Sequence, residues 1–162
     1  MDRFVEVLSA LLSAAEASYT DILGTLEAVC AKAVPSNEDA EVAAGHLAPG
    51  VTALAHAFGK LSAHWLVPLR NRRVFSEPPQ PLTSDEGTVS FPSWPQAAYL
   101  VRIARELPDE VAATIEGIPF VDNESIHIEF LEAACRMPAA VAARVARHEA
   151  RWLSTHHWHS CR

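Results

Sequence analysis

A repeated phrase limits the fold of this chain more than any other feature. Residues 107–119 read LPDEVAATIEGIP, and residues 137–149 read MPAAVAARVARHE. Aligning each residue with the one 30 positions later keeps nine residue pairs of matching type in one register. The pairs are Leu100/Phe130, Val101/Leu131, Ala104/Ala134, Leu107/Met137, Pro108/Pro138, Val111/Val141, Ala112/Ala142, Ala113/Ala143 and Ile115/Val145. Because proline is well tolerated in the first turn of a helix, Pro108 and Pro138 each predict a helix start.

Two helices in a period of 30 residues are typical of α-solenoids, in which each helix pair buries its apolar face against the next pair. The alternative is that any two alanine-rich amphipathic helices align in this way, but the shared proline punctuation favours a repeat. We therefore predict an all-α fold: a right-handed α-α superhelix, HEAT-like in the broad sense, with one long Pro-rich loop. One continuous domain is expected, divided into an N-terminal helical segment (1–73), the loop (74–95), two helix-pair repeats (96–153) and a His-rich tail (154–162).

Capping residues and prolines mark the other expected helix boundaries. A first helix is expected over residues 2–17. Later helices are predicted to start at Thr20 or Asp21, at Ser36, at Pro49, near residue 95, and at Asp122 or Asn123. Pro35 is expected to end the second helix, and Pro68 to break a short helical piece. Segment 74–95 is rich in proline and is predicted to be a loop, which Phe75, Val89, Phe91 and Trp94 could pin onto the helices.

The composition agrees with a helical globular protein. The chain has 162 residues, of which 49% are hydrophobic and 20% charged, with only six glycines. The three cysteines, Cys30, Cys135 and Cys161, are odd in number and far apart, which argues against a disulfide framework and favours a cytoplasmic location. No run of about 18 apolar residues occurs, so no membrane span is expected.

Three longer stretches carry a resemblance. WLVPLRNRRVFSEPP, FPSWPQAAYLVRIARELPDEV and VDNESIHIEFLEAACRMPAAVAARV follow one another in this order. Over about residues 58–150 the chain resembles the N-terminal helical region of a group of large, uncharacterised bacterial proteins, a region similar to short HEAT-like repeats. The resemblance implies a helical-repeat fold and carries over no catalytic residues. The ending RWLSTHHWHSCR does not continue the pattern, which favours a fragment of a larger protein.

Arginines and tryptophans supply the candidate interaction surface. Arg144, Arg147 and Arg151 are spaced i, i+3 and i+7, either as a ridge that binds a ligand or nucleic acid or as a solvated helix side. The net charge of −7 makes nucleic acid an unfavourable partner. Trp65 and Trp94 flank the loop and either anchor it or form an exposed binding hot spot.

Weaker signals lie elsewhere in the chain. RNRR at 70–73 is either a docking patch or a solvated helix end. Pairs at i, i+4 spacing are expected between Arg102 and Glu106 and between Glu132 and Arg136. The tail holds His156, His157, His159 and Cys161, donors that suit zinc, but ligands within six residues at a chain end rarely form a structural site.

No recognisable nucleophile motif or phosphate-binding loop is present, and Cys135 is interpreted as a small buried hydrophobe. The sequence thus predicts no enzyme activity, no cofactor and no metal. It predicts a helical-repeat scaffold or protein-interaction module, whose partner is another protein, the remainder of a longer parent chain, or a second copy. The alternatives are nucleic-acid binding through the arginine ridge and metal binding through the tail.

Overall fold

The computed structural model describes residues 20–47 and 51–153. Within these ranges the chain is mostly helical and has one small two-stranded sheet, which confirms the helical class. The helix predicted over residues 2–17, Pro49 and the His-rich tail lie outside the described residues.

Helices succeed one another along the described chain. A helix over residues 20–30 is followed by α2 (Asn37–His46), α3 (Val51–Lys60), a 3-10 turn (Ala63–Trp65), α4 (Leu66–Asn71), α5 (Pro95–Ile103), α6 (Pro108–Gly117), α7 (Glu124–Cys135) and α8 (Ala139–Leu153). Ser36 and Asp39 form a capping box at α2, with Ser36 Oγ accepting from the Asp39 N–H at 3.1 Å. Asn123 caps α7 by accepting from the Ser125 N–H. The predicted starts at Ser36, Asn123 and Pro108 are therefore confirmed.

Pro68 does not break its helix, so this expectation is wrong. It is the third residue of α4, after Leu66 and Val67. The N–H groups of the first helical turn have no partner within the helix, so a proline there removes no hydrogen bond. The position of a proline within its helix decides whether it interrupts the helix, and the 3-10 turn before α4 moves Pro68 into a tolerated position.

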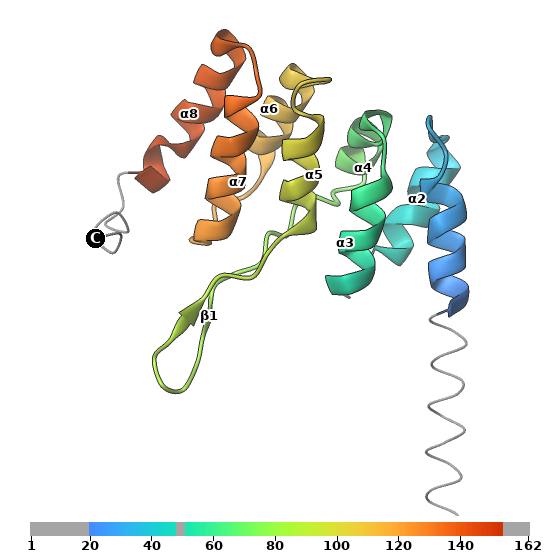
Figure 1. Cartoon of the computed structure of the whole chain (residues 1–162), viewed down its shortest axis with the longest axis horizontal. Coiled ribbons are helices and arrows are strands. Elements are labelled where there is room, and N and C mark those ends of the chain that lie inside the picture. Colours follow the sequence, from blue (N-terminus) through green and yellow to red (C-terminus); the bar gives the residue numbers. More distant parts are fainter. Residues whose placement is uncertain (1–19, 48–50, 154–162) are drawn as a thin grey trace, which may run out of the picture.

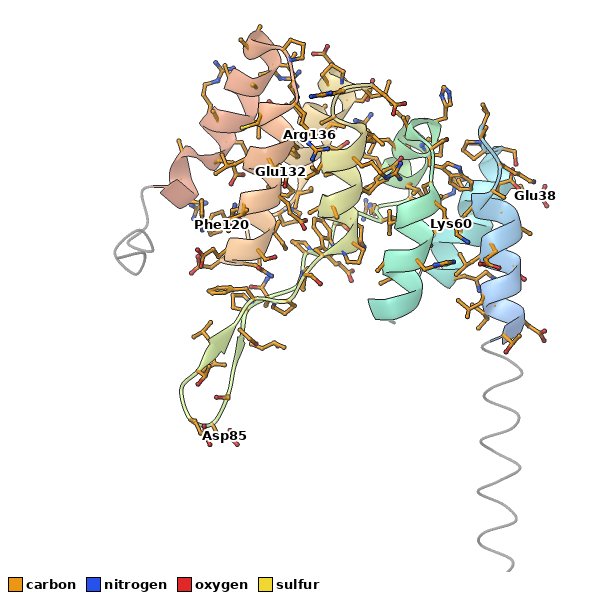
Figure 2. The ribbon with its side chains drawn as sticks, viewed as in Figure 1. Glu38, Lys60, Asp85, Phe120, Glu132 and Arg136 are labelled. Carbon is orange, nitrogen blue, oxygen red and sulfur yellow. The ribbon has the colours of Figure 1, made fainter. Side chains whose placement is uncertain are left out.

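The Pro-rich segment contains a short hairpin that the sequence reading missed. Strands β1 (Leu82–Thr83) and β2 (Val89–Ser90) pair antiparallel. Gly87 has φ +79°, a left-handed conformation that suits the turn. The hairpin projects away from the helices (Figure 1), with Asp85 at its tip (Figure 2).

The residues expected to pin this segment differ in burial. Phe75 and Trp94 are buried at its two ends, as predicted. Phe91 is half-buried. Val89 remains 49% exposed, so its expected contact with the helices is not formed. The segment is therefore anchored at its ends, and its middle extends away from the helices.

The helices lie in two rows. In one row α3 packs against α5, and α5 packs against α7. In the other row, which lies behind the first in Figure 1, α4 packs against α6, and α6 against α8. Helices 30 residues apart in the sequence are thus neighbours in space.

One continuous apolar core runs from Leu26 to Val145. The aligned positions differ in part, since Val111 is buried whereas Val141 is half-buried. At three pairs, Leu100/Phe130, Ala104/Ala134 and Ile115/Val145, both members are buried. Packing therefore explains why these positions keep their residue type. None of the helices described is long and apolar enough to cross a membrane.

The two cysteines of the described region differ in exposure. Cys30 is buried, and burial raises the pKa of its thiol. Cys135 is exposed, so its interpretation as a buried hydrophobe is wrong. It is the last residue of α7, where the core-facing side is already filled by Ala133 and Ala134.

This difference predicts unequal reactivity. Because the thiolate is the reactive form, we expect iodoacetamide to modify Cys135 several-fold faster than Cys30 in the folded protein. Mass spectrometry of the tryptic peptides after short exposures measures the two rates. Urea should bring them together, and equal rates in the folded protein would contradict the burial of Cys30.

Candidate functional site

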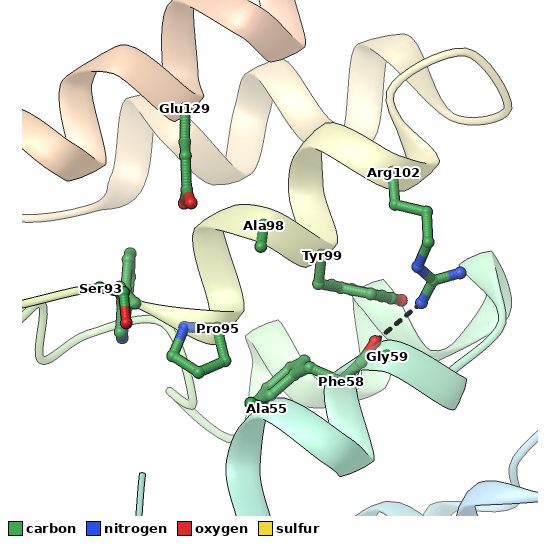
Figure 3. A pocket seen from close by; sticks show the side chains of 10 residues that line it. Ala55, Phe58, Gly59, Ser93, Pro95, Ala98, Tyr99, Arg102 and Glu129 are labelled. Carbon is green, nitrogen blue, oxygen red and sulfur yellow. Dashed lines mark hydrogen bonds between the residues drawn. The ribbon is translucent and has the colours of Figure 1, made fainter. Parts of the chain in front are cut away.

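A pocket of about 300 Å³ lies at the junction of α3, α5 and α7. Figure 3 shows Phe58 entering from α3, Tyr99 and Arg102 from α5, and Glu129 from α7. The remaining lining residues are Ala55, Gly59, Ser93, Trp94, Pro95 and Ala98. The pocket therefore exists only because three successive helices of one row meet.

Aromatic rings form the wall of this pocket. The ring centroids of Phe58 and Tyr99 lie 5.6 Å apart, and those of Phe75 and Trp94 lie 6.5 Å apart in an edge-on arrangement. Phe75 also stacks on Tyr99, behind the pocket wall. The Tyr99 hydroxyl donates to the Ser62 carbonyl at 2.8 Å. Buried aromatic rings in mutual contact hold fixed rotamers, so the wall is preorganised.

Arg102 closes one end of the pocket. Its Nη2 donates to the carbonyl oxygens of Phe58 at 2.8 Å and Leu61 at 2.5 Å, and its guanidinium carbon lies 5.3 Å from the centre of the Tyr99 ring. The two carbonyls end α3, where the helix dipole favours a cation. The ion pair expected between Arg102 and Glu106 is replaced by these backbone contacts.

Glu129 lies at the α7 side of the pocket, away from Arg102 (Figure 3). Its side chain is half-buried, and Oε2 is shielded from solvent with no hydrogen-bond partner among the described residues. Burial, and secondarily the charge of Glu132, raises the pKa of the Glu129 carboxyl to about 7. The pocket thus presents an acceptor that lacks a donor.

The raised pKa predicts a pH-dependent effect of Glu129→Gln. Between the ordinary pKa of 4.5 and about 7, the folded protein binds more protons than the unfolded chain, so its stability falls as the pH rises. Glutamine stays neutral and removes this dependence. We expect wild type and variant to have equal free energies of unfolding at about pH 4. At about pH 8 the variant should be more stable by about 1–2 kcal/mol, a difference that is small because solvent screens the half-exposed side chain.

Urea unfolding at both pH values measures this difference. Glu132→Gln is the matched control, because Glu132 is an exposed carboxylate one turn away on the same helix. A Glu129→Gln variant that is no more stable than wild type at the higher pH would show that the Glu129 carboxyl is solvated.

The two candidate tryptophans have different positions. Trp65 is fully buried, and its Nε1 donates to the Lys32 carbonyl at 2.9 Å, so it anchors the fold and is not an exposed hot spot. Trp94 is buried too, but one side of it lines the pocket. The burial of Trp94 and its contact with Phe75 suit the anchoring interpretation, whereas the hydrogen bond of Trp65 is with Lys32, outside the Pro-rich segment.

The three candidate arginines of α8 are engaged in different ways. Arg144 is paired with Glu116 at 2.6 Å and with Asp109 at 3.2 Å, both from α6. Arg151 lies over the Phe120 ring, with its guanidinium carbon 4.5 Å from the centroid. Arg147 is exposed. Two of the three guanidinium groups thus have contacts within the protein, which weakens the case for a phosphate-binding ridge.

RNRR at 70–73 is likewise partly engaged in the fold. Arg70 pairs with Glu110 at 2.8 Å, and Arg72 donates to the Pro68 and Asn37 carbonyls. Arg73 is exposed and has φ +60°, a conformation that is uncommon outside glycine. The expected i, i+4 pair between Glu132 and Arg136 is confirmed at 2.6 Å (Figure 2).

The structure also assembles a buried polar cluster that scattered histidines did not predict. His127 Nδ1 lies 2.5 Å from Glu149 Oε2, and His127 Nε2 lies 2.7 Å from the Val121 carbonyl. His148 Nδ1 contacts the other Glu149 oxygen at 2.8 Å. The Trp152 ring stacks on His127, with centroids 4.8 Å apart. This cluster joins α7 to α8 and is a structural element of the core.

Within residues 20–47 and 51–153, no group of three or more histidine, cysteine or acidic side chains is placed to hold a metal ion. The tail residues His156, His157, His159 and Cys161 lie outside these ranges. No family model, no curated protein and no solved structure matches the chain.

Proposed function

We propose that this protein is a non-enzymatic helical-repeat module, HEAT-like in architecture, that binds a segment of a protein partner across the row formed by α3, α5 and α7. The observation that carries this proposal is the pocket at the junction of these helices, whose acceptor Glu129 Oε2 is shielded and has no donor in the described part of the chain. A buried acceptor without a donor is energetically costly, and a bound partner relieves this cost.

The arrangement of the helices supports a repeat architecture. Helices 30 residues apart pack directly on one another, α5 on α7 in one row and α6 on α8 in the other, and three of the aligned pairs are buried in both members. Stacked helix pairs of this kind present one face of a row to a partner, as α-solenoids do. The chain would act as a scaffold whose binding surface is built from several successive helices.

The chemistry of the pocket supports a binding role. Binding pockets are mostly apolar, with a few polar groups that fix the orientation of the ligand. Here aromatic rings and a single carboxyl group line one pocket, while Arg102 is held by backbone carbonyls. Preorganised aromatic walls also reduce the entropic cost of binding a partner.

A blocking substitution tests this function. Ala98 is exposed on α5 and lines the pocket, so Ala98→Trp would fill it without altering Glu129. Peptides selected on the wild-type protein from a random displayed library should lose binding to Ala98→Trp. They should keep binding to Ala143→Trp, a control at an exposed alanine on α8. Failure to select any peptide, or equal binding to both variants, would contradict the proposal.

A second copy of the chain is a further candidate partner. Phe120 is 41% exposed and Ile128 of α7 is 52% exposed, although large apolar side chains are usually buried. If the exposed Ile128 side chain mediates self-association, light scattering should show a mass that rises with concentration in the wild type and stays that of a monomer in Ile128→Lys. A wild-type monomer at all concentrations would exclude self-association.

A further inference from the structure

The polar groups of the Glu129 pocket indicate the chemistry of what enters it. Three residues that line the pocket carry donors. The Tyr99 hydroxyl donates to the Ser62 carbonyl, and Arg102 Nη2 donates to the Phe58 and Leu61 carbonyls, while the Ser93 hydroxyl can both donate and accept. Glu129 Oε2 is an acceptor that has no hydrogen-bond partner within residues 20–47 and 51–153. An ionised carboxylate can only accept hydrogen bonds, so the complementary group is a donor.

The aromatic rings of the pocket indicate which kind of hydrogen-bond donor would bind there. The faces of Tyr and Trp rings attract cations electrostatically, and Arg102 already shows this contact with Tyr99 inside the pocket. A lysine or arginine side chain has an aliphatic stem that packs along rings and a charged end that seeks a carboxylate. An anionic ligand would face the Glu129 carboxylate and is disfavoured.

We propose that the Glu129 pocket binds a lysine or arginine side chain of the protein partner, with its charged group on Glu129 and its stem between Phe58, Trp94 and Tyr99. This inference rests on the proposed interaction function and adds the chemistry of the contact. Charge complementarity supports it, because the Glu129 carboxyl group lines the pocket and the whole chain carries a net charge of −7.

Small lysine and arginine probes test the inference directly. N-acetyl-lysine methylamide and its arginine counterpart should shift the indole NMR signal of Trp94 saturably, while the uncharged norleucine counterpart should not. We expect Glu129→Gln to weaken lysine binding by about tenfold or more, the effect of losing one hydrogen bond to a charged group. Glu132→Gln should retain most of the wild-type affinity.

The pH dependence of probe binding provides an independent test of the cation inference. Lysine binding should be stronger at about pH 8, where Glu129 is ionised and lysine is still charged, than at about pH 5.5. Equal binding of the norleucine probe, equal binding by Glu129→Gln, or no Trp94 shift up to the solubility limit of the probes would overturn the cation inference.

The peptide selection separates this inference from the proposed function. Selected peptides that lack lysine and arginine but lose binding to Ala98→Trp would overturn the cation inference while leaving the interaction function intact. Selected peptides that need one basic residue and lose affinity for Glu129→Gln would support both. If no peptide is selected, the interaction function itself fails, and the cation inference fails with it.

Discussion

Glu149→Ala is expected to lower the free energy of unfolding by about 3 kcal/mol, because it leaves buried polar atoms without their hydrogen-bond partner. The Glu149 side chain is completely buried, and that of His127 is 3% exposed. Both carboxylate oxygens of Glu149 face histidine nitrogens, at 2.5 and 2.8 Å. A loss of this size is a large share of the 5–15 kcal/mol that stabilises a typical domain.

The geometry explains why His127 depends on Glu149. Both ring nitrogens of His127 face acceptors: the Val121 carbonyl accepts from the Nε2–H, and a proton lies between Nδ1 and Glu149 Oε2. Without Glu149, the Nδ1 side of a buried ring has no partner, between the stacked Trp152 ring and the edge-on Phe130 ring. Unpaired buried polar groups are costly because water cannot reach them.

Glu132→Ala provides a matched control for this prediction. Glu132 and Arg136 form an ion pair of similar length, 2.6 Å, but the Glu132 side chain is 52% exposed. Its removal should cost about 0.5 kcal/mol or less. Urea unfolding of the two variants under the same conditions measures the contrast, and similar small effects of both would show that the cluster does not join α7 to α8.

Trp65→Ala should cost a further large amount, about 3–5 kcal/mol, through the cavity that it leaves. Trp65 has no exposed surface, and its indole Nε1 donates to the Lys32 carbonyl, which follows the helix over residues 20–30. The side chain therefore joins the first described helix to the 3-10 turn that leads into α4. We expect both lower stability and faster hydrogen exchange in residues 20–47.

Two further substitutions serve as controls for the loss of stability in Trp65→Ala. Trp65→Phe keeps most of the apolar volume and loses the hydrogen bond to Lys32, so it should cost clearly less than the alanine variant. Val34→Ala removes methyl groups from a side chain that is 68% exposed and should change stability by less than about 0.5 kcal/mol. If Trp65→Ala lowers the free energy of unfolding as little as Val34→Ala does, Trp65 does not anchor the first described helix to the 3-10 turn.

Local chemistry made much of the fold predictable. Ser36, Pro108 and Asn123 act within a few residues of their own position, so their effect on helix starts can be read from the sequence. The 30-residue register predicted which helices are equivalent, and they are neighbours in space. Pro68 and the hairpin were missed because their outcome depends on a preceding 3-10 turn and on pairing between two-residue strands, which have little sequence signal.

The site was harder to predict, because its residues meet only in the folded chain. Phe58, Tyr99 and Glu129 lie on three helices and share no local motif. One signal was present: in the 30-residue alignment, Glu129 takes the place of the buried Tyr99, so a carboxylate stands where the other repeat has an aromatic ring. Likewise, His127 and Glu149 are 22 positions apart, and only the packing of α7 on α8 joins them.

The titration of Glu129 shows whether its carboxyl group is shielded from water, as the proposed interaction site requires. NMR of the protein with 13C-labelled glutamate follows the Glu129 carboxyl signal, assigned by its absence in Glu129→Gln. The shielding described here predicts a midpoint near pH 7 in the free protein, moving to lower pH when the lysine probe binds. A midpoint near the ordinary 4.5, unchanged by the probe, would mean that the carboxyl is solvated and would contradict the proposed site.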